Sequence, residues 1–284
     1  MSDSSYTFDS PDADFILRAP LRPDDPESAQ FKDFHTHKAI LSTASTVFHD
    51  MFSLPQPHQS AEDDANLPIV PVVEPAEIFE IFLRLIYPIE LPTIDSPRIV
   101  GHLLQVSEKY MTNGVHTRLK QILASPSFLK SDPIWVYAIA CRMDLDEEAQ
   151  LAVRHTYKIN LIRDIPPPLL QEMTTETYNR LLGSHATRRE ELTAVVNKTE
   201  CPQRKGKCIC GIRFYTNLKK EITLAIWERP FLDRRRLDSC LPSSKGPKSA
   251  CELGLSCRLS ARVISSYFND ILDGVESLNQ TQDG

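Results

Sequence analysis

Apolar positions between residues 33 and 52 recur at the spacing of two short amphipathic helices. Ile40 and Leu41 form the apolar face of the first helix. The face of the second helix comprises Val47, Phe48, Met51 and Phe52. Hydroxyl side chains separate the two faces: Ser42, Thr43 and Ser45. A small oxygen-bearing side chain at this place can cap the second helix, so the pattern predicts a helix pair.

Three stretches around this helix pair favour strands, over residues 14–18, 29–34 and 67–73. The first two are so close in sequence that we expect them to form an antiparallel hairpin. Pro68 and Pro71 remove hydrogen-bond donors from the third stretch, which favours a position at the sheet edge.

Helical periodicity follows the third strand. Pro75 opens an apolar helix that closes at Tyr87, and a second helix begins near Ser96. Gly114 breaks the pattern before one more amphipathic helix that ends near residue 123. Together these elements predict an α+β domain over residues 13–125, which is about the commonest domain size.

No strand pattern recurs after residue 125. Asp132-Pro133 and Asp146 are typical helix starts, and Thr174 or Thr175 opens a further helix. Gly183-Ser184 is expected to end that helix and start another. These patterns predict a helical extension over residues 126–199, followed by a cysteine-containing helical tail over residues 200–284 with helices near 216–228 and 258–275.

The polar ends and loops of the chain carry little periodicity. Residues 1–12 are predicted to form a disordered tail, and residues 54–66 a mobile loop. The net charge of -6 argues against bulk attraction to nucleic acid or anionic membrane. No apolar run approaches the roughly 20 residues of a membrane helix. The N-terminus lacks the regions of a signal peptide, so we expect an intracellular protein, cytoplasmic or nuclear.

Four motifs in the first half resemble those of the BTB/POZ family. Ala13-Asp14-Phe15 is similar to the family's first strand, and the stretch from Phe34 to Leu41 to its Phe-x-x-His-Lys/Arg-x-x-Leu signature. Phe79, Leu83, Ile86 and Tyr87 match a family helix that usually ends in Leu/Ile-Tyr. The stretch 103–110 is similar to a Leu-Leu-x-x-Ala-x-Lys-Tyr helix. The proline-containing stretches and the helical extension resemble those of fungal BTB/POZ proteins in particular.

The resemblance implies a non-enzymatic protein-interaction module that self-associates and captures a partner protein. Its interface would comprise Asp14, Phe15, Leu17, His37, Lys38, Leu41 and Phe48. The resemblance also implies an ion pair between Asp14 and Lys38, with two solvated side chains as the equally weighted alternative.

Some members of the family recruit a cullin through an apolar-x-Glu element after the second helix, which makes them ubiquitin-ligase substrate adaptors. Here the corresponding residues are Phe52-Ser53-Leu54-Pro55-Gln56, with no glutamate in place. Val72-Val73-Glu74 has the right letters at another position. A cullin adaptor is therefore the less favoured interpretation.

Six of the seven cysteines fall in the tail. They are Cys201, Cys208, Cys210, Cys240, Cys251 and Cys257. Zinc sites usually contain pairs separated by two to four residues, and Cys208 and Cys210 are closer than that. Ordinary thiols and a structural zinc site both remain open, and no other cofactor is predicted.

No catalytic constellation emerges. His35 and His37 are expected on different faces, and the chain has neither a Gly-x-Ser-x-Gly elbow nor a glycine-rich phosphate loop. The basic stretch 204–220 and Arg234-Arg235-Arg236 leave one alternative, a nucleic-acid-linked or transcriptional regulator with a zinc-stabilised tail.

Overall fold

The computed structural model describes residues 7–22, 30–54, 67–165, 167–200, 209–241 and 261–280. The chain divides into two compact units. We call Met1–Ala152 the N-terminal unit and Val153–Gly284 the C-terminal unit. The predicted mobile loop, apart from Leu54, lies outside the described residues.

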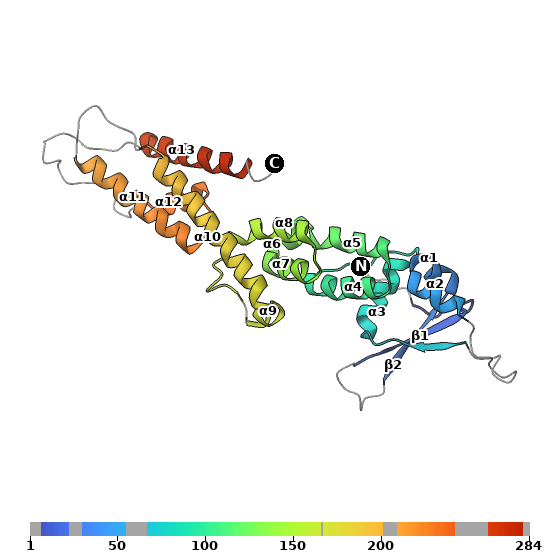
Figure 1. Cartoon of the computed structure of the whole chain (residues 1–284). Helices are drawn as coiled ribbons and strands as arrows, with labels where there is room; N and C mark the ends of the chain where they lie inside the picture. The colour runs from blue at the N-terminus through green and yellow to red at the C-terminus, as the bar shows by residue number, and fades with distance from the viewer. Residues whose placement is uncertain are drawn as a thin grey trace. The chain divides into compact units, whose positions relative to one another are not determined.

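The N-terminal unit contains a sheet of three strands in the order β2-β1-β3. The strands are β1 (Phe15–Pro20), β2 (Phe31–Thr36) and β3 (Ile69–Pro71). β1 pairs antiparallel with β2, with Leu17 opposite Phe34, and parallel with β3. β1 and β2 are labelled in Figure 1. The predicted hairpin and the predicted edge position of the proline-bearing strand are both confirmed.

Eight helices are described in this half of the chain, the last of which crosses the unit boundary. They are α1 (Lys38–Ala44), α2 (Thr46–Ser53), α3 (Ala76–Ile86), α4 (Pro97–Lys109), α5 (Asn113–Leu123), α6 (Pro126–Ser131), α7 (Pro133–Arg142) and α8 (Asp146–Thr156). The core side chains Leu17, Phe34, Phe79 and Leu103 come from the sheet, α3 and α4, and all are inaccessible to solvent. The predicted α+β fold followed by helices is therefore confirmed.

Local capping fixes the predicted helix pair. The Ser45 hydroxyl accepts a hydrogen bond from the Phe48 amide (3.1 Å) and donates one to the Tyr110 carbonyl (2.6 Å). The first bond satisfies an amide that has no partner inside α2, and the second ties α2 to the end of α4. Ser45 is thus both the helix cap and a tertiary contact.

Gly114 does not break the helical pattern as the sequence predicted. It lies within the first turn of α5, and the chain instead turns at Met111, whose φ of 51° is in the left-handed region. The Thr112 amide donates to the Ser107 carbonyl across this turn (2.9 Å). A left-handed residue that ends a helix is a common C-terminal motif, although glycine is its usual occupant.

Residues 7–12 differ from the predicted disordered tail, whose first six residues lie outside the described part of the chain. The Phe8 side chain is buried and packs edge-on against the rings of Phe34 and Tyr87. The His35 amide donates to the Phe8 carbonyl (2.9 Å). We call residues 7–12 the N-terminal strap, because they lie along the outer edge of β2.

The N-terminal unit continues past residue 125, where the sequence placed a domain boundary. α7 packs closely against α4 at Gly101, which has no side chain. A Cβ atom at this position would lie 3.2 Å from Cγ1 of Ile139 in α7. Arg98 of α4 also stacks on the Trp135 ring of α7, with 4.9 Å from Cζ to the ring centroid. These contacts are long-range in sequence, so the periodic pattern could not reveal them.

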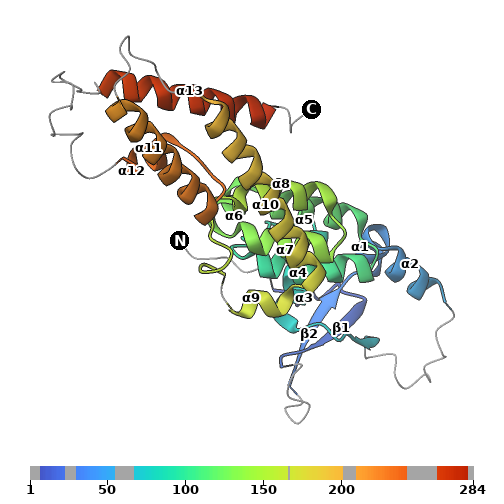
Figure 2. The same cartoon turned by 60° about the vertical axis from the view of Figure 1, so that its left-hand side comes forward.

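The C-terminal unit is helical in its described part. Its helices after α8 are α9 (Pro167–Glu172), α10 (Thr175–Lys198), α11 (Ile209–Glu228), α12 (Arg234–Ser239) and α13 (Ala261–Gln280). α11 and α13 lie beside α10 around a core that includes Leu192, Ile222 and Phe268 (Figures 1 and 2).

The expected break at Gly183-Ser184 is wrong, because α10 is one continuous helix through both residues. Thr174 caps its start and accepts a hydrogen bond from the Thr177 amide (3.1 Å). Helix formation is cooperative, so flanking turns carry a single exposed glycine at a cost of about 1 kcal/mol. Glycine alone is therefore a weak signal for a helix end.

Candidate functional site

The structure places most of the predicted interface residues in the core. Four side chains are almost inaccessible to solvent: Phe15, Leu17, Leu41 and Phe48. They fill the interior of the N-terminal unit and do not form an apolar surface. Asp14, His37 and Lys38 do reach the surface, and the interface at this place stays a prediction.

Asp14 and Lys38 interact through the backbone. Lys38 is the first residue of α1. Its backbone amide donates a hydrogen bond to the Asp14 carboxylate (2.8 Å). The Lys38 ammonium lies over the rings of Phe15 (5.5 Å) and Phe52 (5.9 Å). Among the described residues no ion pair joins the two side chains. Asp14 caps α1, where a carboxylate also complements the helix dipole.

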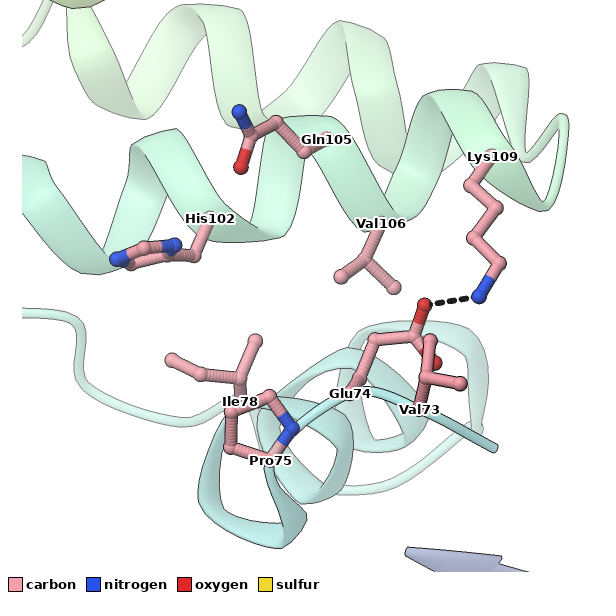
Figure 3. Close-up of a pocket in the computed structure, with 8 residues that line it drawn as sticks. All are labelled: Val73, Glu74, Pro75, Ile78, His102, Gln105, Val106 and Lys109. Atoms are coloured by element: carbon pink, nitrogen blue, oxygen red, sulfur yellow. Dashed lines mark hydrogen bonds and ion pairs between the residues drawn. The ribbon is translucent and has the colours of Figure 1, made fainter. Parts of the chain in front are cut away.

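A shallow hollow of about 250 Å³ lies between the start of α3 and one face of α4 (Figure 3). Its apolar lining is Val73, Pro75, Ile78 and Val106. Its polar lining is Glu74, His102, Gln105 and Lys109. A hollow lined by apolar side chains and a few polar groups is suited to one or two side chains of a bound protein.

The Glu74 carboxylate is the buried charge of this hollow. It accepts hydrogen bonds from the Lys109 ammonium (2.5 Å) and the Tyr110 hydroxyl (3.1 Å), and Figure 3 shows Lys109 reaching it from α4. Burial, followed by the nearby Glu74 charge, raises the pKa of Tyr110 above its usual value. Since both oxygens of Glu74 are bonded, the carboxylate anchors α4 to the start of α3.

Exposed apolar side chains continue from the hollow along β3. Ile69, Pro71 and Val73 alternate along the chain and are exposed, Val73 to 73%. Alternate residues of an extended chain share one face, so these three form a stripe that runs into the hollow. The prolines predicted an edge position for β3 but no binding role, because an apolar run does not reveal which of its side chains are covered.

The Val72-Val73-Glu74 triplet cannot offer its glutamate to a cullin in this conformation, because that carboxylate is turned inward. The residues at the position of the family's cullin-binding element begin inside α2. Phe52 and Ser53 are the last two residues of this helix, and Leu54 follows it. Pro55 and Gln56 lie outside the described residues.

The proposed metal ligands are largely untested. Cys201, Cys208, Cys251 and Cys257, and the side chain of Cys210, lie outside the described part of the chain. Cys240 is half-buried at the end of α12, where its thiol donates to the Arg236 carbonyl (3.3 Å). Burial raises the pKa of this thiol. Within the described ranges no three potential ligands gather around one point.

The basic run of α12 is partly used inside the C-terminal unit. Arg234 bonds to Ser265 (3.0 Å) and Asn269 (3.1 Å) of α13, and its guanidinium stacks on Phe268. Arg236 donates to the Ala225 carbonyl of α11 (2.5 Å). Two of the three arginines therefore hold helices together and do not present their charge as a nucleic-acid patch would.

His35 and His37, which were considered for acid–base chemistry, make contacts that hold neighbouring segments together. The His37 ring lies 3.3 Å from the Tyr87 hydroxyl through Nδ1 and 3.4 Å from an Asp12 carboxylate oxygen through Nε2. The His35 backbone holds the strap. No serine, threonine or cysteine side chain bonds to either imidazole among the described residues, so no nucleophile is paired with them.

The BTB/POZ domain family model matches residues 28–127. The matched range covers β2, the helix pair, β3 and α3–α5, and β1 completes the same sheet. The chain therefore contains a BTB/POZ domain, which is a protein–protein interaction module and not an enzyme family. None of the curated proteins compared with the chain matches it. Across the described ranges, every helix is too short or too polar to span a bilayer.

Proposed function

We propose that this protein acts without catalysis, pairing with a second copy of itself and capturing another intracellular protein through its BTB/POZ domain. The stripe of Ile69, Pro71 and Val73, together with the adjoining hollow, is the contact surface. The BTB/POZ match supports protein binding as the class of activity. The exposed stripe is the observation that supports this location.

The stripe combines two properties of a binding surface. Its apolar side chains lose unfavourable contact with water when a partner covers them. β3 is also an edge strand of the sheet, and Pro71 has no backbone N–H group to donate to an added strand. Contacts at this edge would therefore depend more on side chains than on an added strand.

Replacing Val73 with aspartate tests the proposal. An aspartate at this exposed position leaves the core unchanged but places a charge in the apolar stripe. We expect the sedimentation mass of the full chain to fall from dimer to monomer at micromolar concentration, with an unchanged far-ultraviolet circular dichroism spectrum. Ile162→Asp is the matched control, because Ile162 is still more exposed (85%) and belongs to the C-terminal unit. The Ile162→Asp variant should remain dimeric.

A wild-type chain that is monomeric at all accessible concentrations would remove the self-association. A dimer that persists in Val73→Asp would remove this stripe as its interface. Capture of a partner is tested separately, by comparing the proteins retained from native lysate by wild type, Val73→Asp and Ile162→Asp. A partner that all three retain equally binds elsewhere.

A salt titration tests the nucleic-acid alternative. Phosphate contacts make affinity fall steeply with salt, in proportion to the number of contacts. We expect no salt-dependent binding of duplex DNA or RNA by the full chain, since two arginines of α12 bond within the C-terminal unit. A steep slope would favour the alternative instead.

A further inference from the structure

The N-terminal strap packs on Phe34, His37 and Tyr87 at the outer edge of β2, and we call the surface that these three residues form the groove. The Phe8 ring is 6% exposed and lies edge-on to Phe34 (5.8 Å between centroids) and to Tyr87 (5.1 Å). Edge-to-face packing of this kind is specific for an aromatic ring. Phe8 is thus seated like the anchor residue of a bound peptide.

The backbone of the strap is held in the manner of an added strand. The Phe8 carbonyl accepts a hydrogen bond from the His35 amide (2.9 Å), on the side of β2 opposite β1. The next backbone bond from this segment to β2 is from Asp14 to Thr36 (3.1 Å), beyond the end of the strap. The strap is a short segment near the chain terminus, and attachments of such segments are of the kind that opens locally without global unfolding.

The other end of the groove is polar. The Asp12 carboxylate lies 3.4 Å from Nε2 of His37, four residues after the aromatic anchor. The Tyr87 hydroxyl accepts a hydrogen bond from the His37 amide (2.8 Å) and also lies 3.3 Å from Nδ1 of its ring. Tyr87 therefore serves both ends of the strap: its ring packs on Phe8, and its hydroxyl orients the imidazole that faces Asp12.

The residues of the groove are also held by contacts outside the strap. Phe34 comes from β2, His37 precedes α1 and Tyr87 follows α3. Phe34 is fully buried and its ring packs on that of Phe79 of α3, with 5.8 Å between the ring centroids. This contact holds the Phe34 ring in place. Removal of Phe8 would leave a preformed aromatic pocket beside a sheet edge and an oriented histidine.

We infer that this groove is a docking site for an extended segment of a partner protein that carries an aromatic residue and, four positions later, a carboxylate. The strap is its resident occupant and displays the chemistry that the groove recognises. A partner segment binds when the strap leaves, so the strap competes with it. This site lies at the sheet edge opposite β3 and is independent of the proposed stripe.

A strap peptide supplied in trans tests the inference. The probe is the labelled heptapeptide Thr-Phe-Asp-Ser-Pro-Asp-Ala, which has the sequence of residues 7–13. In Phe8→Ala the resident anchor is missing, so the peptide ring can fill the vacated pocket. We expect saturable binding to full-length Phe8→Ala that is roughly tenfold or more tighter than binding to wild type, where the tethered strap competes at a high effective concentration. Fluorescence anisotropy measures both affinities.

Matched peptides and variants assign the recognition. A peptide with alanine in place of its phenylalanine should not bind Phe8→Ala, and one with asparagine in place of its second aspartate should bind more weakly. Tyr87→Phe keeps the ring but loses the hydroxyl that orients His37, so it should abolish the difference between the aspartate and asparagine peptides. Val73→Asp should leave the peptide affinity unchanged, which separates this site from the proposed stripe.

The inference is overturned if folded Phe8→Ala binds no peptide, if it binds the alanine peptide equally well, or if wild type binds as tightly as the variant. Circular dichroism establishes that the variant is folded. If Phe8→Ala does not fold, Phe8→Leu replaces it. Leucine keeps most of the buried volume but loses the edge-on ring contacts, so the peptide ring should displace it and bind more tightly than it binds to wild type. The same three outcomes then decide.

Discussion

Three buried polar residues, two in the N-terminal unit and one in the C-terminal unit, differ in how fully they are hydrogen-bonded. In the N-terminal unit, Glu74 and Ser45 each have two hydrogen-bond partners, and these bonds tie elements together. In the C-terminal unit, His185 is fully buried and its Nε2 lies 2.9 Å from the Thr156 hydroxyl. Its Nδ1 finds no partner in the described part of the chain. A satisfied network holds its geometry, whereas a half-satisfied histidine makes a fold sensitive to its charge.

The chain contains one tryptophan in each unit, which allows the two to be followed separately. Trp135 lies in α7 and Trp227 in α11. In a Trp135→Phe background, fluorescence during denaturant unfolding reports the C-terminal unit, and in a Trp227→Phe background it reports the N-terminal unit. The comparison between the units can therefore be measured within one full-length protein.

The largest expected effect is that of pH on the C-terminal unit. Burial, followed by the Arg189 charge, lowers the pKa of His185 to about 4. In the unfolded chain the value is about 6.5, so as pH falls the unfolded state binds the proton first. Stability is complete above pH 6.5 and is lost as pH falls from 6.5 to 4, by about 3 kcal/mol. Denaturant unfolding of the Trp135→Phe variant across this range measures the loss.

His185→Gln is the control for this prediction, because it keeps a polar side chain that does not titrate. Carboxylates and His155, whose pKa is also lowered by burial and by Lys158, contribute to both curves. The difference between the two proteins isolates His185. Parallel curves from pH 6.5 to 4 would show that His185 accepts a proton in the folded state, and the contrast between the units would disappear.

A smaller effect is expected from Lys109→Met in the N-terminal unit. The substitution removes the ammonium and leaves the Glu74 carboxylate buried with the Tyr110 hydroxyl alone. Since Lys109 is 48% exposed and partly screened, we expect a loss of about 1 to 2 kcal/mol, measured by unfolding in the Trp227→Phe background. The double variant Glu74→Gln, Lys109→Met should recover part of it, because no buried charge then lacks a partner. Strictly additive losses would contradict coupling between the two residues.

The smallest effect is a gain. Gly183 lies on the exposed side of α10, and a Cβ there would meet no atom within 4 Å. Gly183→Ala should therefore stabilise the C-terminal unit by about 0.5 to 1 kcal/mol. Gly274→Ala is the opposite case, because its Cβ would lie 2.8 Å from Cγ1 of Val195 across the α10–α13 contact. Equal effects of the two substitutions would mean that the α10–α13 packing adjusts without cost.

Local signals were enough for much of the fold. The hairpin, the edge position of β3, the cap at the start of α2 and the starts of α4 and α10 were all predictable. Each depends on residues within a few positions of one another, as with Ser96 before Pro97 or Thr174 before α10. Errors arose where a local signal competed with distant contacts, as with the helix that continues through Gly183.

The candidate sites were much less predictable. Phe15 and Leu41 belong to the right motif, yet the fold buries them, and the accessible stripe on β3 had no distinguishing pattern. Phe8 lay in a stretch without periodicity, because a single anchor residue cannot produce a repeat. Its role depends on Phe34 and Tyr87, which are distant in sequence.

The sequence by itself determined the order and type of most elements and the kind of domain, because hydrophobic period, caps and proline positions act over a few residues. Only the tertiary structure decided which of those apolar side chains became core and which remained at the surface. It also paired Glu74 with Lys109 and enclosed His185. Burial and charge pairing arise between residues that meet only after folding, so they are properties of the packed chain and not of any one segment.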